Sequence, residues 1–134
     1  MAVVRDHDAL KRAVLKPNKL LKLQAEIDMP DINVMEPFLV TLSVATSACD
    51  TYARLFLPPS MPAEDPFTGS ATGAMASYIW AKGLIKKPSF IAEQGHSLGW
   101  PGQAMVAVLG RPQAISGVRI SGQVHLTMSG KLNL

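Results

Sequence analysis

The chain has 134 residues, which is the length of one domain with a single hydrophobic core. Hydrophobic residues make up 48% of it and charged residues 17%, and this balance excludes an intrinsically disordered chain. Its one cysteine, Cys49, excludes an internal disulfide and a cysteine-based zinc site, and we expect it to be a buried packing residue.

The formal net charge is +3. The spacing of the basic residues near the start of the chain indicates whether they form a nucleic-acid-binding surface. They are spaced as on the solvent-facing side of helices rather than clustered into a phosphate-binding stripe (Lys11, Arg12, Lys16, Lys19 and Lys22). No apolar run approaches the roughly 20 residues that a membrane-spanning helix needs. The first residues also lack the apolar segment of a secretory signal. We therefore expect a cytoplasmic protein with no nucleic-acid partner and no membrane partner.

The first quarter of the chain predicts a short strand followed by two helices. Residues 3–4 are suited to the end of a strand. Asp8 is suited to cap a helix over residues 9–15, because an aspartate side chain accepts hydrogen bonds from the free amides of a first turn. Pro17 suits the first turn of a second helix, which we expect to continue to about residue 25.

The rest of the chain predicts strands around one hydrophobic helix. Small residues at 68–73 lead into large apolar residues up to position 81, and Lys82 with Gly83 favours a helix end there. Runs of alternating or β-branched residues predict six further strands, of which 118–127 is the clearest (residues 34–46, 52–56, 88–94, 104–109, 118–127 and 131–134). The inventory indicates an α+β fold with an antiparallel sheet, formed by one domain over residues 1–134.

Residues 65–71 form a candidate ligand site at the start of the hydrophobic helix. Amides at a helix N-terminus lack intrahelical partners and lie at the positive end of the dipole, so they attract anions. Gly69 lets a ligand approach, while Thr68 and Ser70 add hydroxyl groups. Asp65 could accept a hydrogen bond from an ammonium or hydroxyl of the same ligand. The pattern predicts a site for a small carboxylate, and ordinary helix capping by Thr68 stays open as the alternative.

The other candidate groups carry weaker signals. The three histidines, His7, His96 and His125, lack metal-binding spacing, so we expect no metal site. Glu93 could act as a general base, although a lone acid is more often a structural hydrogen-bonding group. The glycine-rich segments match neither a P-loop nor a dinucleotide fingerprint, and we expect no cofactor.

Several motifs together resemble one family. The sequence EDPFTGSA at residues 64–71, preceded by RLFLP at 54–58, is similar to the E-D-P-x-T-G-S-A signature and the R-x-F-x-P strand of PhzF-like (phenazine biosynthesis) proteins, which share the diaminopimelate epimerase fold. EQG at 93–95 with LGWP at 98–101 resembles their E-Q-G-x-x-M-G-R-P segment, with Trp100 in place of the arginine. Residues 118–134 resemble their closing strands. The resemblance covers nearly the whole chain but only the C-terminal half of the family's two-half architecture.

The resemblance has implications for fold and site. It implies a barrel-like sheet wrapped around a central hydrophobic helix, with an active site in the cleft between two such halves. It also implies that Asp65, Gly69 and Ser70 hold the polar groups of the substrate. The family's acid/base glutamate belongs to the first half, which has no counterpart in this chain, so catalysis by this chain alone is an open question.

Three functions are compatible with these observations. The first is a PhzF-like isomerase half that binds a small carboxylate and is active, if at all, as a paired assembly. Its partner would be a second copy in a homodimer or a separate chain that carries the N-terminal half. The second is a non-catalytic binding or interaction module from a truncated or split PhzF-like gene. The third is a structural domain in which EDPFTGSA only caps a helix.

Overall fold

The computed structural model describes residues 1–27, 35–43, 49–58 and 60–132. Its regular elements are three α-helices, one short 3₁₀ helix and seven strands that form one sheet. The helices are α1 (His7–Arg12), α2 (Pro17–Glu26), α3 (Gly69–Ala81) and η1 (His96–Leu98). The strands are β1 (Ala2–Val3), β2 (Phe38–Thr41), β3 (Thr51–Phe56), β4 (Glu64–Asp65), β5 (Ser89–Gln94), β6 (Gly102–Arg111) and β7 (Ala114–Ser121). None of the described helices is long and apolar enough to cross a membrane.

The sheet is mixed, so the prediction of an antiparallel sheet is wrong. Its strand order is β1-β2-β3-β5-β6-β7, and β4 pairs with β3 beside this path. The pairs β1–β2 and β3–β5 are parallel, and the others are antiparallel. A parallel pair needs a long crossover connection. Here α1 and α2 lie in the connection from β1 to β2, and α3 lies in the connection from β3 to β5.

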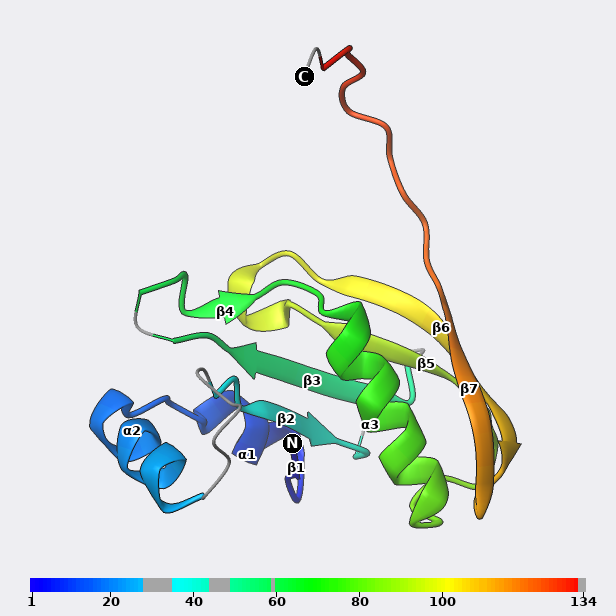
Figure 1. The fold of residues 1–134 in the computed structure, drawn as a ribbon, viewed down its shortest axis with the longest axis horizontal. Coiled ribbons are helices and arrows are strands. Elements are labelled where there is room, and N and C mark those ends of the chain that lie inside the picture. Colours follow the sequence, from blue (N-terminus) through cyan, green and yellow to red (C-terminus); the bar gives the residue numbers. More distant parts are fainter. Residues whose placement is uncertain (28–34, 44–48, 59, 133–134) are drawn as a thin grey trace.

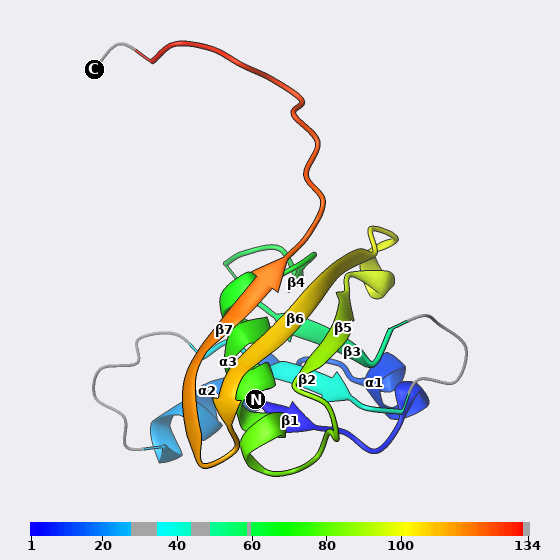
Figure 2. The ribbon, with the colours of Figure 1, turned by 90° about the vertical axis from the view of Figure 1, so that its right-hand side faces the viewer.

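The sheet curls, and α3 packs against its concave face (Figures 1 and 2). Alternate side chains of β3, β5 and β6 point to this helix, because successive residues of a strand face opposite sides. The helix contributes Met75, Ala76 and Ile79, all with no exposed surface, to the main hydrophobic core. The sequence therefore predicts this helix and its burial correctly, and the architecture is an α+β fold with a half-barrel sheet.

The opposite face of the sheet is partly covered by α1. Leu10 of this helix packs with Cys49 and Tyr52 in a second, smaller cluster, and Cys49 is buried as expected. The cap of α1 is Asp6, not Asp8: the Asp6 carboxylate accepts a hydrogen bond from the Ala9 amide at 2.7 Å. Asp8 instead lies in the first turn, and the helix begins two residues earlier than predicted.

The C-terminal strand prediction is only partly confirmed. β7 begins at Ala114 and ends at Ser121, whereas the alternating pattern continues to residue 127. Residues 122–132 are exposed and have no regular secondary structure, and they extend away from the rest of the molecule (Figure 1). The predicted strand at 131–134 is absent at Lys131 and Leu132, and its last two residues lie outside the described part. The strand predicted over 34–46 is reduced to β2, with residues 34 and 44–46 outside the described part.

Candidate functional site

The four predicted site residues lie where β4 leads into α3. Asp65 is the last residue of β4 and pairs with Leu55 of β3, so its backbone is fixed by the sheet. Thr68 precedes the first helical residue, Gly69. Asp65 and Thr68 are half-buried, while Gly69 and Ser70 are exposed. The structure therefore brings a fixed carboxylate next to an accessible helix start.

The capping interpretation of Thr68 is wrong. Its hydroxyl group makes no capping hydrogen bond to α3 and instead donates to the Asp65 carboxylate in a short contact. The first turn of α3 also contains no acidic residue. The Thr68 side chain thus does not cap this helix and instead orients Asp65.

The Gln94 side chain supports the loop between β4 and α3 through hydrogen bonds, a role that the sequence analysis did not predict. Its side chain is 1% exposed. The Gln94 amide nitrogen donates to the Asp65 carbonyl at 2.7 Å, and its oxygen accepts from the Thr68 amide at 3.3 Å. A signal was available: Phe90, Ala92 and Gln94 share the core-facing side of β5, and a glutamine there needs buried polar partners.

The next residue, Gly95, lets the loop after β5 approach the candidate site. Its φ is +94°, and a Cβ atom there would lie 2.3 Å from the Trp100 carbonyl oxygen and 2.7 Å from that of Pro66. Only glycine tolerates both this dihedral angle and this close backbone approach. Gln94 and Gly95 therefore both support the segment of residues 65–68.

Glu64 lies next to Asp65 in the sequence but has a different environment. It forms an ion pair with Arg54, with Nη2–Oε1 at 2.5 Å and Nε–Oε2 at 3.1 Å, and accepts from the Ser97 hydroxyl at 2.5 Å. Burial raises the pKa of Glu64, but the hydrogen bonds from Arg54 and Ser97 and the Arg54 charge outweigh it, so the pKa is lowered. Glu64 is an ionised structural group.

Glu93 is also held by neighbours, on the face of the sheet opposite Gln94. Its buried carboxylate contacts the His96 ring and accepts from Gln103 at 3.3 Å. Burial raises the pKa of Glu93, but hydrogen bonds from Cys49, His96 and Gln103 prevail and lower it. The structural role of Glu93 is therefore favoured, and the strand places it away from Asp65.

The histidines do not join the candidate site. His7 and His96 both pack on the Tyr52 ring, each with a centroid separation of 4.8 Å. His125 lies in the exposed segment after β7. Within the described ranges, no group of three His, Cys, Asp or Glu side chains is placed to hold a metal ion.

Comparison with protein families gives a match over almost the full chain. The family described as phenazine biosynthesis-like protein (PhzC-PhzF) matches residues 2–130. An uncharacterized isomerase of Deinococcus radiodurans is 36% identical over 82 residues, and the uncharacterized isomerase YfhB of Bacillus subtilis is 35% identical over 81 residues. The alignments cover 58% and 60% of this chain but only 27% of each relative.

Solved structures with a similar fold also exceed this chain in length. A PhzC/PhzF protein from Clostridium difficile has a TM-score of 0.66 at 22% identity, and the match covers 98% of this chain and 43% of that one. A PhzF-family protein of Bacillus anthracis has a TM-score of 0.63 at 23% identity, covering 79% and 35% respectively. At these identities the similarity establishes the fold.

Proposed function

The chain belongs to the PhzC-PhzF family of phenazine biosynthesis-like proteins, and on this premise we propose that it binds a small carboxylate at the N-terminus of α3 and takes part in isomerisation only as a paired assembly. The curated relatives are named isomerases. The observation that carries the proposal is the placement of Asp65, oriented by Thr68, beside an exposed helix start without a side-chain cap.

The proposed binding mode assigns one role to each group. The amides of the first turn of α3 and the Ser70 hydroxyl donate to the ligand carboxylate, which the helix dipole also attracts. Gly69 leaves room for the ligand, because no atom beyond its chain neighbours and the backbone of its own helix lies within 4 Å of the position that a Cβ would take. Asp65 accepts from an ammonium or hydroxyl group of the ligand. Thr68 and Gln94 act as positioning residues.

The need for a partner follows from proton transfer. Isomerisation by a proton shift requires an acid/base group within hydrogen-bond reach of the substrate. The two glutamates nearest in sequence to the site segments, Glu64 and Glu93, are ionised and already hydrogen-bonded to other side chains. We propose that the acid/base group comes from another chain, either a second copy or a separate chain that carries the N-terminal half of the family's architecture.

An alternative function is a non-catalytic module that binds the same carboxylate. This alternative is favoured by the same observation, that Glu64 and Glu93 are already hydrogen-bonded to other side chains. The two functions differ in solvent hydrogen exchange. An isomerase assembly should incorporate deuterium from D2O into a bound hydroxy or amino acid, whereas a binding module should not.

Substitution of Asp65 tests the binding site. We expect Asp65→Asn to weaken binding of small α-hydroxy and α-amino carboxylates by about tenfold or more, because the charge-assisted contact to the ligand cation or hydroxyl is lost. Isothermal titration calorimetry measures the dissociation constants. The matched control is Asp8→Asn, which removes an exposed carboxylate from α1. Equal binding by both variants and the unsubstituted chain, or no binding by any of them, would contradict the proposed site.

A further inference from the structure

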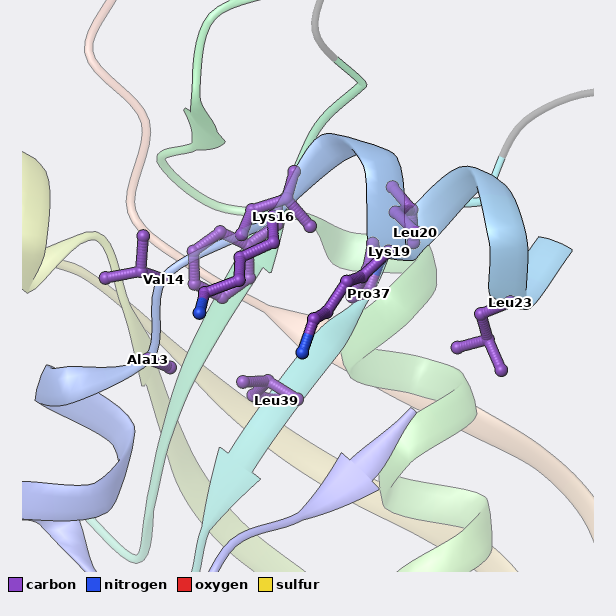
Figure 3. A pocket seen from close by; sticks show the side chains of 10 residues that line it. Ala13, Val14, Lys16, Lys19, Leu20, Leu23, Pro37 and Leu39 are labelled. Carbon is purple, nitrogen blue, oxygen red and sulfur yellow. The ribbon is translucent and has the colours of Figure 1, made fainter.

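A second surface feature lies apart from the α3 site. It is a groove of about 300 Å³ between α2 and β2, bounded on one side by the segment that joins α1 to α2 (Figure 3). Its lining is mainly aliphatic and aromatic (Val14, Leu15, Leu20, Leu23, Leu39 and Phe56). None of Asp65, Thr68, Gly69 and Ser70 lines it, so it is a separate feature.

Two lysines, Lys16 and Lys19, form the polar part of the groove. Figure 3 shows both side chains extending over it, with their ammonium groups on the side of Leu39. Among the described residues neither lysine forms an ion pair. Lys22, one turn further along α2, pairs with Glu26 at 3.8 Å and does not line the groove.

The charged side chains that line the groove, among the described residues, are the two lysines. Within the part of the chain that the structure describes, no carboxylate lines it. The first turn of α2 has no acidic residue and no side-chain cap, so the positive end of this helix adds to the two ammonium groups. An apolar cavity with a few charged groups at its edge is the usual form of a small-molecule site.

We propose that this groove binds an amphipathic carboxylate, an acid with an unbranched or aryl apolar body. The apolar body lies between Leu20, Leu23 and Leu39, and the carboxylate reaches Lys16 and Lys19. A volume of about 300 Å³ holds roughly ten atoms at the ~30 Å³ that one water molecule occupies. This size fits an acid such as octanoate. The proposal does not depend on the proposed isomerase function, because it uses other residues.

Octanoate titration of the 134-residue chain tests the proposal. We expect shifts of the methyl NMR signals of Leu20, Leu23 and Leu39. The variant Lys16→Gln/Lys19→Gln should weaken octanoate binding by about tenfold or more, because both charge-assisted contacts are lost. Both lysines are exposed, so their replacement should leave the fold intact. The matched control Lys22→Gln removes a charge from the same helix outside the groove and should bind octanoate as the unsubstituted chain does.

Three outcomes would overturn the proposal. Octylamine binding as strongly as octanoate would mean that the lysines do not select an anion. Equal octanoate affinity of Lys16→Gln/Lys19→Gln and of Lys22→Gln would also mean that the two lysines do not select the anion. Shifts confined to the amides of Gly69 and Ser70 would place octanoate at the α3 site instead, which would reject the groove and leave the proposed isomerase function standing.

Discussion

Gln94 is a polar side chain in the hydrophobic interior, and its three hydrogen bonds join β5 to the loop that carries Asp65. It bonds the carbonyl of Asp65 and both the amide and the hydroxyl group of Thr68. Since these groups are part-buried, they have little water to replace a lost partner. The position of Asp65 therefore depends on a residue that contacts no proposed ligand.

We expect Gln94→Leu to lower the free energy of unfolding by about 1–3 kcal/mol, because it leaves a backbone amide and a carbonyl unpaired. It should also weaken carboxylate binding, since Thr68 and Asp65 lose their support. Denaturant titration followed by circular dichroism measures the stability. The control Gln113→Leu makes the same change at an exposed turn position and should stay within ~0.5 kcal/mol of the unsubstituted chain. Equal stability of the two variants would contradict the role of Gln94.

Glu64 and Arg54 together join four elements. Glu64 itself is on β4, and it binds Arg54 of β3 and Ser97 of η1. Arg54 also donates to the carbonyls of Leu10 and Ala13 at 2.7 and 2.9 Å, which fixes the C-terminal end of α1 on the sheet. This explains why α1 ends at Arg12 instead of continuing to residue 15 as predicted: the guanidinium takes up its last carbonyls.

The ion pair and hydrogen bonds of Glu64 predict that the stability of the fold depends on pH. Because the folded-state pKa of Glu64 is lowered, its contribution is fully present above the unfolded-state pKa and is lost as the pH falls through the folded-state value. Glu64→Gln should therefore be less stable than the unsubstituted chain at pH 7, and the difference should close at lower pH. Unfolding titrations between pH 7 and pH 3 measure it. Glu36→Gln, at an exposed carboxylate, should show no such difference. A difference for Glu64→Gln that stays constant with pH would exclude this role.

At the scale of helices and strands, the sequence predicts the type and place of most elements but not how the strands pair. The apolar residues of α3 and the alternation in β3, β5 and β6 reflect local burial, so their positions follow from spacing alone. Alternation shows which face a residue occupies and not the direction of the neighbouring strand. The parallel pairs β1–β2 and β3–β5 therefore could not be derived from it. The sequence predicts the site motif because EDPFTGSA is local, but it does not predict the support from Gln94, which is 26 residues from Thr68.

At the scale of the whole molecule, the segment after β7 carries apolar side chains that the fold does not bury. Val124, Leu126 and Met128 are 93%, 88% and 85% exposed, and they continue the alternating pattern of β7 beyond its last paired residue. Burying them would contribute roughly 1.5–3 kcal/mol each. A strand pattern with one apolar side, which pairs with no strand among the described residues, is the kind of surface expected to pair with another chain.

The homodimer form of the proposed assembly makes a prediction about this segment. We expect light scattering at micromolar concentration to give the mass of a dimer. Leu126→Asp should shift the mass to that of a monomer, because a charge on the apolar side of the pairing strand would be buried in the interface. Thr127→Asp adds the same charge on the opposite side of the alternating pattern, so it should leave the dimer intact. A monomer from the unsubstituted chain would reject the homodimer and leave a separate chain, carrying the N-terminal half, or the non-catalytic binding module.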